Sequence, residues 1–214
     1  MKMNENREVR NRMLAEKVIK GLQSRNMEGF YAETKEDALK LALELIPTGS
    51  SVSWGGSMSI EEIGLKKAMR EGDYIVYDRD AAKSPEERRE VEIKTFGCDY
   101  FLASSNAVTE DGILVNIDGN SNRVAAIAYG PKHVLMIVGM NKITKDVDAA
   151  IYRARNEAAT INAQRFPVNT PCKVTGSCAN CKSPDTVCCQ FLTTRFSKHT
   201  GRIKIILVNE NLGF

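Results

Sequence analysis

Short apolar runs alternate with longer amphipathic stretches along the first half of the chain. Apolar and β-branched runs between turn residues predict strands, whereas apolar residues three or four positions apart predict helices. The predicted strands span residues 30–32, 51–54, 74–77 and 100–103, and the predicted helices span residues 4–26, 35–45, 60–70 and 85–96. This alternation predicts the α/β class, with a mostly parallel sheet flanked by helices.

The second half of the chain departs from that alternation. Strands are predicted at close spacing, with turn sequences between them, so a hairpin is expected. These strands span residues 107–109, 113–117 and 133–138, followed by a last strand at 203–208. A short helix is predicted at 123–129 and a long one at 144–165. We expect residues 28–143 and 203–208 to form one sheet, with Val52, Ile75 and Leu102 on neighbouring strands.

The chain is expected to be a single domain over residues 1–214, because this length suits one α/β domain with an extension. The N-terminal helix 4–26 is only loosely amphipathic. It is expected to pack on the domain or on a second subunit, which makes a homodimer a candidate assembly. The cysteine-rich segment 166–202 is expected to be a loop insert between the long helix and the last strand.

Composition excludes several classes of protein. Hydrophobic residues make up 43% of the chain, enough for a packed core, and a net charge of +3 does not by itself indicate a nucleic-acid partner. The interleaved basic and aromatic residues of nucleic-acid-binding surfaces are also missing. No apolar signal-peptide region and no apolar run long enough to span a membrane is visible. A cytoplasmic location is therefore expected.

A glycine loop follows the second predicted strand. Gly55, Gly56, Ser57 and Ser59 lie between that strand and the next helix. Glycines let a ligand approach the backbone, and amides at the start of a helix bind anions. We expect this loop to bind an anionic small molecule, although a tight turn without a ligand would use the same residues. The spacing matches neither a Walker A loop nor a dinucleotide-binding fingerprint.

Two further polar turns are expected to meet the glycine loop at the carboxyl ends of the strands. Glu110 and Asp111 are the candidate catalytic acids, although a turn acid is often simply solvated. Asn122 and Arg123 are candidate ligand-binding residues. The planar guanidinium of Arg123 suits a carboxylate or phosphate ligand, and it suits an acid of its own domain equally well.

Five of the six cysteines lie close together in the insert. They are Cys172, Cys178, Cys181, Cys188 and Cys189. Without a secretory signal, clustered cysteines favour metal or redox chemistry over structural disulfides. We expect Cys172, Cys178 and Cys181 to hold a single metal centre, with either Cys188 or Cys189 as the fourth ligand. An iron–sulfur cluster and zinc are both compatible with four thiolates, and free or disulfide-bonded thiols are the alternative.

The order of several motifs resembles the LUD (lactate-utilisation, DUF162) family. The motifs are Trp54-Gly55-Gly56-Ser57-Met58-Ser59, Thr109-Glu110-Asp111-Gly112, Asn122-Arg123 and Gly130-Pro131-Lys132-His133. The resemblance implies a fold similar to that of NagB, RpiA and CoA-transferases. The position of Glu110 resembles that of the nucleophilic glutamate in the Glu-Asn-Gly turn of CoA-transferases, but Asp111 replaces the asparagine.

The resemblance also implies a role in the use of lactate or a related small organic acid, beside iron–sulfur or other redox partner proteins. Three hypotheses follow from it. The chain is an enzyme or enzyme subunit that binds an anionic small molecule, or a non-catalytic metal-bearing subunit that docks to redox partners. The third is a CoA-transferase-like or sugar-phosphate enzyme.

Overall fold

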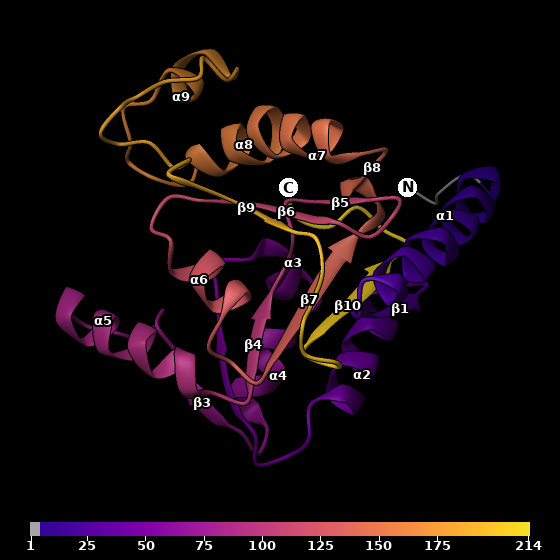
Figure 1. The fold of residues 1–214 in the computed structure, drawn as a ribbon. Helices are drawn as coiled ribbons and strands as arrows, with labels where there is room; N and C mark the ends of the chain where they lie inside the picture. Colours follow the sequence, from indigo (N-terminus) through magenta and orange to yellow (C-terminus); the bar gives the residue numbers. More distant parts are fainter. Residues whose placement is uncertain (1–4) are drawn as a thin grey trace.

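The computed structural model describes residues 5–214 (Figure 1). The strands are β1 (Glu28–Ala32), β2 (Ser51–Trp54), β3 (Ile75–Tyr77), β4 (Tyr100–Ala103), β5 (Ala107–Thr109), β6 (Leu114–Asp118), β7 (His133–Gly139), β8 (Ile143–Thr144), β9 (Gln190–Thr194) and β10 (Ile203–Val208). The α-helices are α1 (Glu5–Ser24), α2 (Lys35–Leu45), α3 (Met58–Glu62), α4 (Leu65–Glu71), α5 (Pro85–Lys94), α6 (Asn122–Ala128), α7 (Val147–Arg153), α8 (Ala159–Ala163) and α9 (Pro171–Thr175). None of the described helices is long and apolar enough to cross a membrane.

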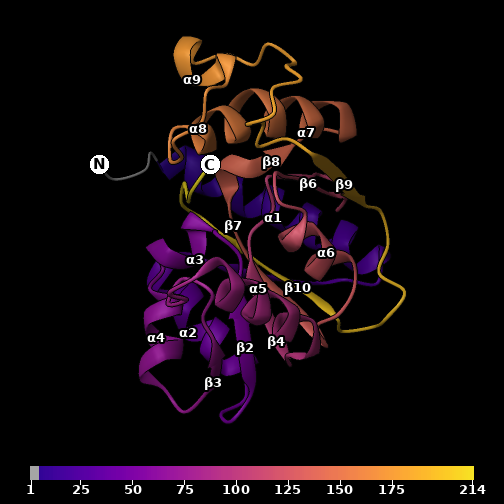
Figure 2. The same ribbon diagram turned by 90° about the vertical axis from the view of Figure 1, so that its left-hand side faces the viewer.

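Six strands form a fully parallel sheet in the order β1-β10-β7-β4-β2-β3. Its central strands are buried on both faces, which explains their continuous apolar runs. On β10, Ile205 and Leu207 join the cluster beneath α1, whereas Ile206 and Val208 join the cluster beneath α2, α3 and α4. Figure 2 shows these helices on opposite sides of the sheet. The α/β class and the mostly parallel sheet predicted from the sequence are confirmed.

The predicted neighbours Val52, Ile75 and Leu102 do lie on adjacent strands, because β2 pairs with β3 on one side and with β4 on the other. The expectation of one sheet is wrong. The strands β8, β5, β6 and β9 form a second sheet in that order. The antiparallel hairpin β5–β6 belongs to this second sheet and lies across the ends of the parallel strands (Figure 1).

Part of the cysteine-rich segment is a strand rather than a loop. β9 pairs antiparallel with β6 along its whole length, from Leu114 opposite Thr194 to Asp118 opposite Gln190. The short helix α9 lies earlier in the same segment. The expectation of a loop throughout 166–202 is therefore wrong. The residues of β9 have little apolar periodicity, and they form a strand because they pair with β6 at the edge of the second sheet.

The helix predicted at 144–165 is a continuous helical rod that consists of three segments. α7 begins at its N-cap Asp146, continues through a π-helical turn at Ala154–Ala158, and ends as α8. Ala150 and Ala154 are fully buried against the second sheet. The helix predicted at 60–70 is likewise divided, because Gly64 adopts a left-handed conformation with φ 75° between α3 and α4.

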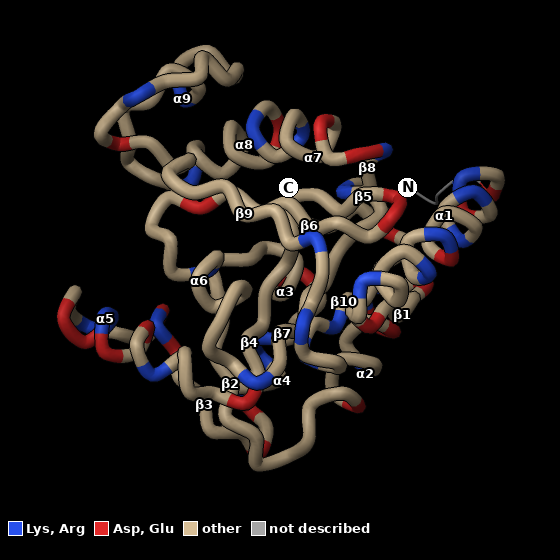
Figure 3. Tube along the Cα trace, viewed as in Figure 1, with Lys and Arg blue, Asp and Glu red and all other residues tan. Residues whose placement is uncertain are grey.

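Charged residues of both signs cover α1 and α5, while the strands of the main sheet are almost uncharged (Figure 3). α1 lies against β1, with Ala15, Val18 and Leu22 buried. The exposed Val9 and Met13 leave part of this helix uncovered. The packing of α1 on its own domain is therefore observed. The homodimer stays a prediction.

The C-terminal part of α1 packs against the turn Glu110-Asp111-Gly112. Gly112 has φ 86°, and a Cβ there would lie 2.4 Å from the backbone nitrogen of Leu22. A Cβ on Gly21 would lie 2.4 Å from the carbonyl carbon of Asp111. Arg25 donates hydrogen bonds to the backbone and side-chain oxygens of Asp111. The two glycines let the helix and the turn meet backbone to backbone.

We predict that Gly112→Ala lowers the free energy of unfolding by about 2–4 kcal/mol, since it adds both left-handed strain and a steric clash. Gly97→Ala is the matched control, because a Cβ at Gly97 meets nothing within 4 Å and its φ is not positive. Urea unfolding of both variants measures the difference. Equal stability of the two variants would show that α1 does not depend on this close contact.

Candidate functional site

The main pocket lies where the parallel strands end. Its volume is about 500 Å³, within the range of small-molecule sites. The loops after β2, β3, β4 and β7 supply its floor, and the end of β6 and the region after α8 supply its walls. Ligand sites of open parallel sheets occupy this same edge. This pocket therefore lies at the edge of the sheet where the sequence predicts a crevice.

The pocket is lined by more cationic than anionic side chains. The cationic residues are Arg79, Arg88, Arg123, Lys142 and Arg165, and the carboxylates are Asp118 and Asp185. Both carboxylates have partners within the protein. Asp118 pairs with Arg123, and Asp185 accepts a hydrogen bond from the backbone of Asn169. The remaining positive charge favours an anionic ligand.

Arg123 extends from α6 into the junction of the two sheets, and its side chain is only 15% exposed. Its two terminal nitrogens make four hydrogen bonds, so most of its donors are used inside the protein. The acceptors are the carbonyl oxygens of Ser104 and Ile117 and the side-chain oxygens of Asn106 and Asn116. Burial lowers the pKa of this guanidinium from its usual value, and Asp118 opposes the shift. Of the two roles considered for Arg123, the contacts support the one within its own domain.

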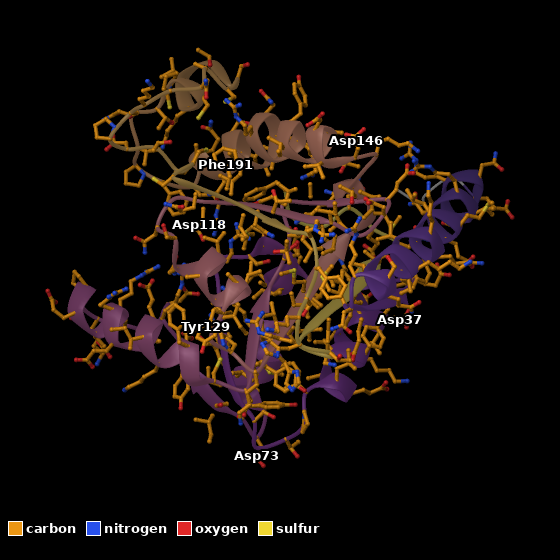
Figure 4. The ribbon with its side chains drawn as sticks, in the orientation of Figure 1. Asp37, Asp73, Asp118, Tyr129, Asp146 and Phe191 are labelled. Carbon is orange, nitrogen blue, oxygen red and sulfur yellow. The ribbon has the colours of Figure 1, made fainter. Side chains whose placement is uncertain are left out.

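Asp118 closes the turn that positions Arg123. Its carboxylate accepts hydrogen bonds from the backbone amides of Asn120, Ser121 and Val124. Figure 4 shows Asp118 between the second sheet and α6. The turn sequence Asp118-Gly119-Asn120 thus starts α6 and holds its first residues against the pocket.

The two loop glycines make room for arginines. Neither Gly55 nor Gly56 has a positive φ, so a left-handed backbone is not the reason for glycine at either position. A Cβ on Gly55 would lie 3.1 Å from Cδ of Arg123. The carbonyl oxygen of Gly56 accepts a hydrogen bond of 2.9 Å from Arg165. At Gly55 the closely approaching group is therefore Arg123, whereas a Cβ on Gly56 would lie at an ordinary contact distance of 3.5 Å from Nη2 of Arg79.

The loop serines have different positions. Ser57 lines the pocket and is the N-cap of α3, where it accepts a hydrogen bond from the amide of Ile60. Ser59 is fully buried behind it and accepts a hydrogen bond from the ammonium of Lys142. Gly55 and Ser59 therefore support the pocket from outside its lining, whereas Gly56 and Ser57 face it.

Glu92 of α5 contacts three of the residues that line the pocket. Its carboxylate is almost buried, accepts a hydrogen bond from Asn122 and forms ion pairs with Arg79 and Arg88. Burial lowers the pKa of Arg79 from its usual value, with the neighbouring charge of Arg88 as the next cause. Asn122 consequently lines the pocket as a partner of Glu92.

Glu110 and Asp111 do not belong to this pocket. Glu110 accepts hydrogen bonds from Lys17 and Lys145, which lower its pKa. Thr109 and Arg25 bind Asp111. The expectation that these acids share a crevice with Arg123 is wrong, because the hairpin turn that carries them points toward α1. Their catalytic role stays a prediction without a neighbouring pocket.

Three of the other insert cysteines act electrostatically on Cys188. The pKa of the Cys188 thiol is raised to about 11 by burial and by the charges of Cys178, Cys172 and Cys181. Arg155 lies 3.8 Å from Sγ of Cys178. Cys189 is exposed, and it contacts the carbonyl oxygen of Thr186 instead. Within residues 5–214, no three His, Cys, Asp or Glu side chains are already arranged around a metal position.

The comparisons with known proteins identify the family. The sequence matches the LUD domain over residues 15–208. The chain belongs to the LUD domain family. The fold is similar to that of a DUF162 family protein from Deinococcus radiodurans, with a TM-score of 0.53 and 12% identity over 93% of this chain and 98% of the other. At that identity the likeness concerns the fold alone. No match was found among the curated proteins.

Several pocket residues of this LUD domain were not anticipated. Arg79 and Arg165 follow a strand and a helix that the sequence did predict, and Lys142 follows the buried run of β7. A lysine between the apolar residues Met140 and Ile143 is the one available signal. The sequence alone does not indicate which of the charged residues that follow a strand or helix point toward the edge of the sheet.

We predict that Arg123→Met lowers the free energy of unfolding by about 3–5 kcal/mol, because it leaves Asp118 and several buried oxygens without their cation. Arg123→Lys should restore little, since one ammonium cannot replace a planar donor of this geometry. The exposed Arg89 provides the control variant Arg89→Met. Urea unfolding followed by Trp54 fluorescence measures all three. A loss no greater than that of the control would contradict the structural role.

Proposed function

We propose that this LUD domain binds a small organic anion, a carboxylate or a phosphate ester, in the pocket at the strand ends. The observation that carries the proposal is the excess of cationic side chains in a cavity whose carboxylates are already paired. Small organic acids such as lactate are of suitable size and charge. Acyl-CoA or sugar-phosphate chemistry is the alternative for the same pocket, through the phosphate groups of those molecules.

Two arginines have donors available for such a ligand. Nε of Arg79 is buried, lies 3.7 Å from Asp80 and makes no hydrogen bond. Arg165 uses one terminal nitrogen for Gly56 and Asn162. Its other N–H groups have no hydrogen-bond partner among residues 5–214. Both side chains approach Gly56: Nη2 of Arg79 would lie 3.5 Å from a Cβ there, and Arg165 bonds the carbonyl oxygen. An anion bound beside Gly56 would therefore be near both guanidinium groups.

We predict that the protein binds at least one of L-lactate, inorganic phosphate and coenzyme A. Arg79→Met and Arg165→Met should each weaken that binding about tenfold or more, the effect of losing a charged hydrogen bond. Isothermal titration calorimetry measures the dissociation constants.

Arg89→Met is the control for net charge, because Arg89 is exposed and does not line the pocket. It should bind as the unmodified protein does. Equal weakening by all three substitutions would indicate general electrostatic attraction. Binding that neither pocket substitution changes would place the ligand elsewhere and contradict the proposal.

A metal centre in the cysteine-rich segment is a second candidate function. It is supported by the electrostatic effect of Cys172, Cys178 and Cys181 on the pKa of Cys188, since four thiolates suit zinc or an iron–sulfur cluster. In this role the chain would be a metal-bearing subunit for redox partner proteins. Cys189 is left out of the set because its sulfur contacts the carbonyl oxygen of Thr186.

We predict one metal centre per chain after anaerobic purification, measured as iron, acid-labile sulfide and zinc. Cys181→Ser should remove it, because a ligand is lost, whereas Cys189→Ser should leave it in place. Equal metal content of the two variants would contradict the ligand set. Absence of all three elements from the unmodified protein would leave a cluster of thiols without a metal role.

A further inference from the structure

A buried lysine forms part of the pocket floor. Lys142 follows β7, is only 2% exposed and still lines the pocket. Its ammonium nitrogen lies 3.0 Å from Oγ of Ser59 and 3.0 Å from Oγ of Ser104. No carboxylate within residues 5–214 is in ion-pair distance of it. A buried lysine without a carboxylate partner is costly, so such a residue calls for an explanation.

Lys66 shows the ordinary arrangement in the same chain. Its side chain is also largely buried, and it pairs with Glu61 at 3.2 Å and Asp80 at 3.0 Å. Lys142 has two hydroxyl groups in place of those carboxylates. Hydroxyl groups can accept from an ammonium and can also donate to a neutral amine. The surroundings of Lys142 therefore accommodate an uncharged amine.

The charges around Lys142 act in the same direction as its burial. Burial, together with the positive charges of Arg153 on α7 and Arg123 on α6, lowers its pKa to about 7. Glu62 on α3 and Glu157 in the π-helical turn oppose the shift as the smaller causes. A substantial fraction of the amine is then uncharged at neutral pH, the form that attacks carbonyl carbons.

We propose that Lys142 forms an imine with the carbonyl group of a small anion held in this pocket, an oxo acid or a phosphorylated aldehyde or ketone. The nitrogen of Lys142 bonds to the carbonyl carbon, the carbonyl oxygen leaves as water, and no oxidant or reductant is required. The arginines of the pocket hold the anionic group of the ligand. This inference rests on the proposed anion-binding function.

The test traps the imine on the intact protein. Glyoxylate and dihydroxyacetone phosphate are the two carbonyl probes, and cyanoborohydride reduces any imine to a stable secondary amine. Peptide mass spectrometry then locates the adduct. We expect more than about tenfold higher modification of Lys142 than of Lys66, because the uncharged fraction of an amine follows its pKa. The probe that reacts distinguishes an oxo acid from a phosphorylated carbonyl compound.

The pH dependence provides a readout that a structural lysine would not produce. Adduct formation should rise up to about pH 7 and then level off, whereas an ordinary lysine continues to gain reactivity up to about pH 10. Lys142→Arg keeps the positive charge and should abolish trapping. Lys67→Arg, at an exposed position of α4, should leave it unchanged. Circular dichroism confirms that the variants are folded.

The outcomes separate this inference from the proposed function. Binding of either probe by calorimetry, without an adduct on Lys142, would overturn the imine and leave the anion pocket intact. Equal labelling of Lys142 and Lys66 would also overturn it, because the reaction would then be unselective. Failure of every anion to bind would contradict the proposed function itself.

Discussion

The burial of one guanidinium group holds the strand ends of the two sheets together. Arg123 bonds to Ser104 and Asn106 after β4 and to Asn116 and Ile117 on β6. A parallel sheet ends in a row of polar backbone groups that something must cover, since unpaired buried groups are costly. Here an antiparallel hairpin covers that edge, and a charged side chain supplies hydrogen bonds to both layers. The pocket is the part of the edge that this cover leaves open.

Arg153 has the same function on the other side of the second sheet. It donates hydrogen bonds to the carbonyl oxygens of Asn106 and Asn141 and pairs with Glu157. The helical rod is thereby attached to the loops after β4 and β7. These two arginines connect the elements around the pocket, so part of the positive charge at the strand ends has a structural role. Evidence for a ligand thus comes from the donors that remain, chiefly those of Arg79 and Arg165.

The sequence predicted the local elements well and their assembly less well. Strands such as β4 and β7 are apolar on both faces, so their burial and parallel pairing follow from composition alone. The second sheet does not follow in this way, because β9 has exposed residues such as Phe191 and gains its structure from pairing with β6. The same limit applies to the site. Gly56, Ser57, Asn122 and Arg123 could be predicted because they belong to polar stretches that follow strand ends, whereas Glu110 belongs to a similar stretch that faces α1.

Lys142 shows why the remaining site could not be predicted. The pKa of its amine depends on how far the carboxylates lie from it in the folded chain. Its neighbours Ser59, Ser104 and Gly213 come from separate parts of the sequence. Lys66 differs from it in no local sequence feature that predicts reactivity, yet Lys66 has two acids and Lys142 has none. Burial and the nearby positive charges of Arg153 and Arg123 raise the cost of the charged form of Lys142. In the proposed function an anionic ligand would offset that cost by binding, and in the proposed reaction a carbonyl ligand would offset it by converting the amine to an imine. Both proposals therefore start from one arrangement of charge at the strand ends.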